Sequence, residues 1–89
     1  MSSFYLVHVR GNPGVTRDVI EAKLNLAVDW YRFDEGHYIL YTTSDEDKWY
    51  ARLESLIKPD GVAFICKLEK DSSNGWMPKS FWDWYGKSR

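Results

Sequence analysis

The sequence has little cysteine and no excess of either charge. A single cysteine, Cys66, excludes an internal disulfide, and its place in the apolar run VAFIC predicts a small buried side chain rather than a nucleophile. Because 12 Lys and Arg face 13 Asp and Glu, the formal net charge is -1. The whole chain therefore lacks the positive field that drives non-specific nucleic-acid binding, and RNA or DNA is not the partner that we favour.

Long apolar runs are absent as well. The apolar stretch in MSSFYLVHVR is short and is interrupted by His8 and Arg10, which predicts neither a signal peptide nor a membrane-spanning segment. We therefore expect a cytoplasmic protein that does not bind membranes. Its 89 residues, 44% of them hydrophobic, supply one small domain with a single core.

Aromatic residues are abundant, at 17% of the chain, and three of the five tryptophans lie in the tail NGWMPKSFWDWYGKSR. Large rings bury much apolar area and are enriched at interface hot spots, so residues 71–89 should cover either their own sheet or a second copy of the chain. Met77, Phe81, Trp84 and Tyr85 would share one face of a short helix after Pro78, whereas an extended tail would place Trp82 and Trp84 on one side.

The rest of the chain alternates strand and helix patterns. We expect strands at residues 4–9, in WYRF, in HYILYT and in VAFICKL, with Asp34, Glu35 and Gly36 as a hairpin turn. A first helix should begin at Thr16 and bury Ile20, Leu24 and Ala27. A second should follow a capping box of Ser44 and Asp47.

The order β-α-β-β-α-β predicts an α+β, ferredoxin-like sandwich in residues 1–70: a four-stranded antiparallel sheet with two helices on one face. The other face stays open. It carries Phe4, Leu6 and His8 if Tyr5, Val7 and Val9 face the helices, and the reverse register is the alternative. The expected core residues are Val7, Ile20, Leu24, Leu40, Trp49, Leu53, Leu56 and Ile65.

The loop RGNPGVTR, between the first strand and the first helix, is a candidate anion site. Arg10, Gly11, Gly14 and Arg17 could hold a phosphate at a helix N-terminus, although any tight connection uses the same residues. The loop resembles that of acylphosphatases, and the resemblance implicates Arg17 in hydrolysis of an acyl phosphate. That family also places an asparagine near its second strand, where DWYRFDEG has none.

Two further resemblances concern the whole fold. The strands FYLVHVRGNP and EGHYILY resemble the two motifs of RNA-recognition motifs, but Glu35, His37 and Ile39 replace the basic and aromatic residues.

Strand FYLVHVR, helix TRDVIEAKLNLA, hairpin WYRFDEGHYILYT, helix DEDKWYARLESL and strand PDGVAFICKL resemble the small CRISPR adaptation-subunit-like and SinR-like proteins. That resemblance implies a homodimer to which the C-terminal segment contributes. Nuclease members place a metal-binding aspartate at the end of the first strand, and HVRG supplies none.

No catalytic constellation is present, and we expect neither a cofactor nor a metal. We expect a polar turn to account for Asp34, Glu35 and His37. We expect His8 to make a structural or pH-sensitive contact. We predict a non-catalytic, self-associating module that binds a protein partner. The alternatives are a phage or mobile-element inhibitor of a host nucleoprotein complex, an acylphosphatase-like hydrolase and an RNA-binding module. The predicted interaction residues are Phe4, Leu6, His8, Trp76, Phe81, Trp82, Trp84 and Tyr85.

Overall fold

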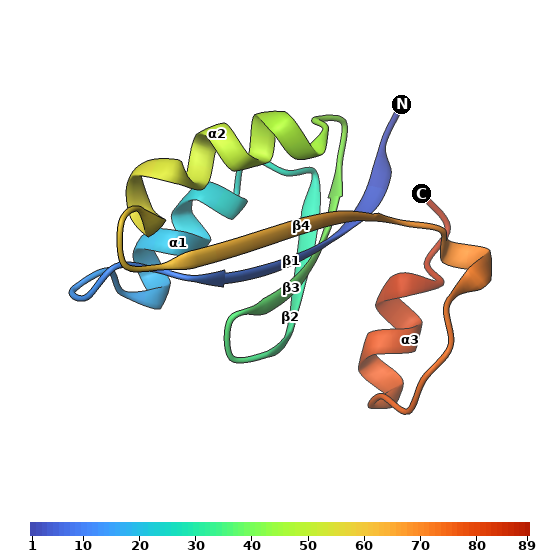
Figure 1. The fold of residues 1–89 in the computed structure, drawn as a ribbon. Helices are drawn as coiled ribbons and strands as arrows, with labels where there is room; N and C mark the ends of the chain where they lie inside the picture. Colours follow the sequence, from blue (N-terminus) through green and yellow to red (C-terminus); the bar gives the residue numbers. More distant parts are fainter.

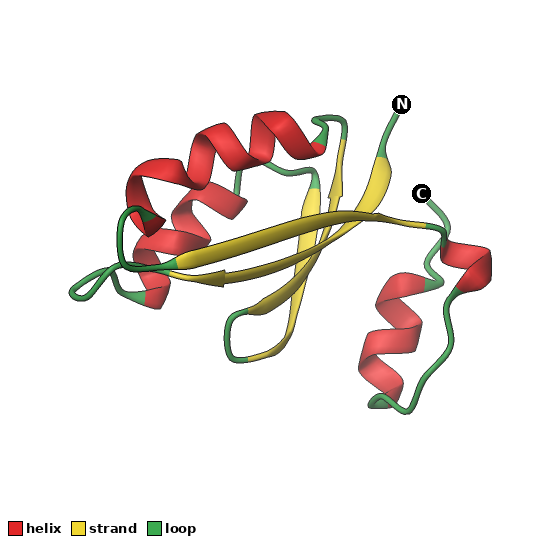
Figure 2. Cartoon of the chain, viewed as in Figure 1, coloured by secondary structure: helices red, strands yellow, loops and turns green.

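The computed structural model describes residues 1–89, which form a four-stranded antiparallel sheet and three helices (Figure 1). The elements in chain order are β1 (Ser3–Arg10), α1 (Arg17–Leu24), β2 (Asp29–Asp34), β3 (His37–Thr42), α2 (Glu46–Ile57), β4 (Val62–Leu68), a 3-10 turn (Lys70–Ser72) and α3 (Lys79–Tyr85). The strands lie in the order β2-β3-β1-β4, so β2 and β4 are the edges. The antiparallel sheet is confirmed, but the tail adds a third helix to the two that we predicted (Figure 2).

The main core lies between the sheet and the helices α1 and α2. Val7 and Val9 point toward these helices, which confirms the predicted register of β1. Six of the predicted core residues are buried there, and Leu56 and Ile65 are only partly buried at its margin. Ile65 lies on the edge strand β4, where no further strand covers it. The buried residues of this core are Val7, Val9, Ile20, Leu24, Tyr38, Leu40, Trp49, Leu53 and Ile57.

The helix boundaries differ from the sequence pattern by a few residues. Helix α1 ends at Leu24, so Ala27 lies beyond it, although Ala27 still packs against the core. Thr16 takes the N-cap position without a side-chain hydrogen bond. The predicted capping box at Ser44 is wrong: Asp45 caps α2, and its Oδ1 accepts from the Lys48 amide at 3.0 Å. Ser44 belongs to the preceding turn, because its amide donates to the Thr42 hydroxyl.

The hairpin turn between β2 and β3 depends on a glycine. Gly36 has a φ of 73°, in the left-handed region that side chains with a Cβ rarely adopt. A Cβ at this position would also lie 2.9 Å from the carbonyl oxygen of Val9 on β1. The turn therefore approaches β1 as closely as it does because residue 36 has no side chain.

The aromatic tail packs on the sheet face that α1 and α2 leave open. Phe81 and Tyr85 on α3 are buried against Phe4 and Ile39, so the helical interpretation of the tail is confirmed. The ring centroids of Phe4 and Tyr85 lie 4.8 Å apart in an edge arrangement. Trp76, in the loop before α3, does not belong to this aromatic cluster and is 99% exposed. The tail therefore serves as a lid on the sheet of its own chain.

We predict that two substitutions of aromatic residues in the tail differ strongly in their effect on stability. Phe81→Ala should lower the free energy of unfolding by about 3–5 kcal/mol, because it removes a buried ring from the second core. Trp76→Ala should change it by less than about 0.5 kcal/mol, because its ring touches solvent. Urea denaturation measures both. Equal losses from the two substitutions, or none from Phe81→Ala, would contradict the packing of α3.

Candidate functional site

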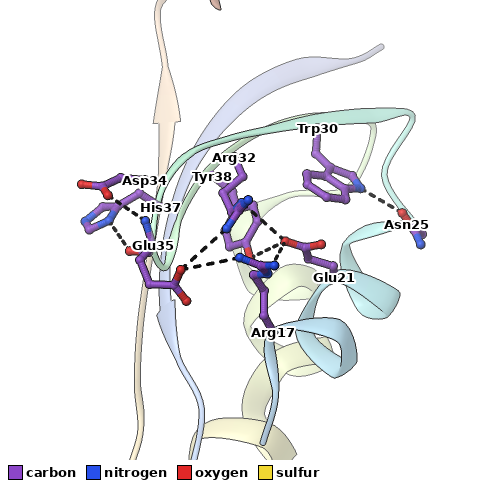
Figure 3. Close-up of polar contacts among 9 residues, drawn as sticks. All are labelled: Arg17, Glu21, Asn25, Trp30, Arg32, Asp34, Glu35, His37 and Tyr38. Atoms are coloured by element: carbon purple, nitrogen blue, oxygen red, sulfur yellow. Dashed lines mark hydrogen bonds and ion pairs between the residues drawn. The ribbon is translucent and has the colours of Figure 1, made fainter. Parts of the chain in front are cut away.

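Charged side chains of α1, β2 and the hairpin turn meet beside β3 (Figure 3). Arg17 lies with its Nε 3.8 Å from Glu21 and its Nη1 3.8 Å from Glu35. Arg32 repeats this arrangement, with distances of 3.8 Å to Glu21 and 3.6 Å to Glu35. The Tyr38 hydroxyl donates to Glu21 at 2.9 Å. Each glutamate therefore faces two arginines, and the charges of the cluster balance.

Tyr38 is the buried member of this cluster. Its burial raises the pKa of its hydroxyl well above the usual value, and the hydrogen bond to Glu21 and the charge of that carboxylate raise it further. The hydroxyl thus stays protonated and keeps donating to Glu21 at physiological pH. This contact connects the sheet to α1 and gives the cluster a structural role.

A cavity of about 240 Å³ lies beside this cluster at the start of α1. Three of the predicted anion-site residues, Arg10, Gly11 and Arg17, line it, but Gly14 does not and is exposed. Glu35 lines the same cavity and carries a negative charge into it. The positive charge of Arg17 is thus already offset by carboxylates, which disfavours phosphate binding there.

The asparagine of the Gly-Asn-Pro-Gly loop is engaged in holding the loop. The backbone N–H of Asn12 donates to the Leu56 carbonyl oxygen at 2.7 Å, and its side-chain Nδ2 donates to the Lys58 carbonyl oxygen at 2.6 Å. Its Oδ1 accepts from the Asp60 amide at 2.8 Å. Asn12 therefore joins this loop to the connection between α2 and β4, so it is not free to position a water molecule for hydrolysis.

A polar clamp holds the end of the chain to β2. The Trp84 indole donates to Asp29 Oδ2 at 2.8 Å, and the Arg89 guanidinium lies 3.2 Å from the same oxygen. The guanidinium also stacks over Tyr41 and Trp84, 4.9 Å from each ring centroid. Burial alone would raise the pKa of Asp29, but the hydrogen bonds from Trp84, the Trp30 amide and Arg89, with the charge of Arg89, outweigh it and hold that pKa below its usual value.

The lid leaves the part of the open face along β4 uncovered. Val62 and Phe64 are 41% and 65% exposed, and Cys66 is exposed beside them. The prediction that Cys66 is buried is therefore wrong: the side chains at alternate positions of β4 point to the open face, and α3 does not reach them. We call Val62, Phe64 and Cys66 the β4 strip.

A second cavity, of about 320 Å³, lies at the margin of the lid, between the tail and the sheet. Most of its lining is apolar and comes from all four strands and the tail, including Leu6, Phe33, Ile39, Leu68, Met77 and Phe81. Leu6 lies opposite Cys66 in the pairing of β1 with β4, so this cavity adjoins the β4 strip. Together they form one apolar surface on a single face of the sheet.

The predicted interaction residues separate into three groups in the structure. Phe4, Phe81 and Tyr85 are buried, whereas Trp76 is fully exposed. The partly buried members are Leu6, His8, Trp82 and Trp84. Only Trp76 therefore offers its whole side chain to a partner.

The acidic turn and the histidines complete the candidate sites. Asp34 accepts from the Glu35 amide at 2.8 Å, and His37 Nδ1 lies 2.8 Å from the Glu35 carbonyl, so these residues make turn contacts (Figure 3). No group of three or more His, Cys, Asp or Glu side chains is placed to hold a metal ion. His8 lies beside His37, with the ring centroids 4.4 Å apart.

Comparisons with protein-family models, with curated proteins and with solved structures find no match for this chain. No helix is both long enough and apolar enough to span a membrane.

Sequence reasoning missed the contacts that depend on distant residues. The four-charge cluster joins α1 to the hairpin, and nothing in either segment indicates that Arg17 and Arg32 share the same two glutamates. The two histidines are likewise far apart in sequence. Correct alignment of β1 with β3 would have placed His8 opposite His37, because both strands were predicted.

We predict a pH-dependent effect of Asp29→Asn. At neutral pH the substitution should lower the stability of the chain, because an amide cannot offset the charge of Arg89. A carboxyl whose native pKa is depressed contributes stability above its unfolded pKa, about 3.9, and that contribution is lost as the pH falls through the native value. The difference from wild type should therefore shrink at about pH 3.

Urea denaturation at the two pH values measures this difference, with Asp83→Asn as the matched control. Asp83 pairs with Lys79 on the exposed side of α3, at 2.8 Å, and its loss should have little effect. If Asp29→Asn lowers the free energy of unfolding by the same amount at both pH values, the result would contradict the role of the Asp29 carboxylate in the clamp.

Proposed function

We propose that this chain is a non-catalytic protein-interaction module that pairs with a second copy along the edge strand β4. The observation that carries the proposal is the exposed apolar β4 strip, with Phe64 at 65% exposure, next to the cavity under the lid. Contiguous apolar surface of this kind is typical of protein-binding sites.

The two sheet edges differ in a way that favours β4. An edge strand presents unpaired backbone N–H and C=O groups, and charged side chains normally keep other strands away. Strand β2 is protected by Asp29, Arg32 and Asp34, whereas Lys67 is the only charged residue of β4. A second β4 in antiparallel orientation would satisfy these backbone groups and place both strips on one face of a continuous sheet.

The same arrangement supports a ferredoxin-like fold. The element order, the strand order β2-β3-β1-β4 and the position of α1 and α2 on one face are those of that fold. They also accord with the resemblance to the CRISPR adaptation-subunit-like proteins. Because β1 ends in Val9 and Arg10, it offers no carboxylate for a metal, and the proposed module acts by binding.

Two observations weigh against the other functions. The carboxylates of Glu21 and Glu35 offset Arg17, so the arginine that the acylphosphatase resemblance implicates would add little positive charge for an acyl phosphate. Phe4, a ring on the open face that could stack on RNA bases, is buried under α3. An inhibitor of a host complex would act by binding as well and could use the same β4 strip.

We predict that Phe64→Ser converts a dimer into a folded monomer. The substitution removes the only aromatic ring of the β4 strip and should leave the main core unchanged. Leu26→Ser is the matched control, since Leu26 is 62% exposed and lies in the loop after α1. Light scattering in line with size exclusion measures the mass, and circular dichroism checks the fold. A wild-type monomer at high concentration, or a dimer that survives Phe64→Ser, would contradict the proposal.

A further inference from the structure

The chain contains two histidines, and the sheet places them side by side. His8 on β1 lies directly opposite His37 on β3. The Val9 amide donates to the Gly36 carbonyl at 2.8 Å, so Val9 and Gly36 occupy a hydrogen-bonded position of the ladder. His8 and His37 therefore occupy the adjacent non-hydrogen-bonded position, where facing side chains approach most closely. Their ring centroids lie 4.4 Å apart, at an interplanar angle of 39°.

The hydrogen bond of His37 defines which of its nitrogens is free. His37 Nδ1 lies 2.8 Å from the carbonyl oxygen of Glu35, which can only accept, so Nδ1 carries the hydrogen. In the neutral ring, Nε2 then holds a lone pair with no partner. A backbone carbonyl that orients an imidazole in this way is the usual second partner of a metal-binding histidine.

One ring nitrogen of His8, Nδ1, is buried without a hydrogen-bond partner. Buried ring nitrogens are nearly always paired, and an isolated one lowers the stability of the folded state unless a water molecule or an ion completes it. On its other side His8 faces Phe64 of β4, which offers no polar group.

We propose that His8 and His37 bind a divalent transition-metal ion of the zinc, nickel or copper class, each through one ring nitrogen. Imidazole is a preferred ligand of these ions, whereas Mg²⁺ and Ca²⁺ require oxygen. Because metal–nitrogen bonds are about 2.0–2.1 Å long, two imidazoles that bind one ion must lie side by side. The centroid distance of 4.4 Å places the rings of His8 and His37 side by side, as binding of one ion by both requires.

The ion would complete its coordination with water, because no third protein ligand is in position. The carboxylate of Asp34 lies on the adjoining turn and would add a favourable field, whereas Glu35 is already paired with Arg17 and Arg32. The ion would also link β1 to β3 at the hairpin end of the sheet. This site does not depend on the proposed dimer.

The test is a calorimetric titration of the full chain, without a histidine tag, with Zn²⁺. We expect one zinc per chain, and a loss of affinity of about tenfold or more in both His8→Gln and His37→Gln, since even the partners of metal ligands contribute that much. Cys66→Ser should bind as wild type does, and Mg²⁺ should not bind. The same titration at a protein concentration low enough for the chain to be monomeric should give the same affinity, which separates this site from dimerisation.

Three results would overturn the proposal: no binding up to about millimolar zinc, affinity unchanged in both histidine variants, or binding abolished in Cys66→Ser. If a histidine variant does not fold, NMR of the wild-type chain replaces it. Zinc must then shift the ring signals of both histidines, and ring signals that do not move would exclude the site.

Discussion

The sheet is apolar on both faces, and the requirement to cover both organises the whole chain. Strand β1 shows it most directly, because Val7 and Val9 point to one face while Phe4 and Leu6 point to the other. Helices α1 and α2 cover the first face, as their apolar stripes allow. The second face depends on the tail, whose α3 covers the part around Phe4 and does not reach the β4 strip. The β4 strip is exposed because the lid ends there.

Polar contacts position the helices and the tail on the two faces of the sheet. The cluster of Arg17, Glu21, Arg32 and Glu35 fixes α1 to the hairpin, and the clamp at Asp29 fixes the tail to β2. In both places the charges are paired with opposite charges. The exposed apolar β4 strip and the unpaired edge of β4 are the features from which we propose a binding function.

Much of the fold could be predicted from the sequence, because apolar spacing reports local structure. The period of two in β1 and the spacing of Trp49 and Leu53 placed the core correctly. The spacing of the tail residues allowed a helix, but its docking on Phe4 is a distant contact that spacing does not encode. Cys66 was misassigned for the same reason: its apolar neighbours indicate a strand, but not how far the lid extends over it.

The most direct test of this account is amide hydrogen exchange of the full chain at low and at high protein concentration. If the tail is a lid on its own sheet and β4 is the interface, α3 should be equally protected at both concentrations. The amides of β4 that do not pair with β1 should become protected only at the higher one. Protection of α3 that rises with concentration would instead show that the tail docks on a second copy, and would contradict the account.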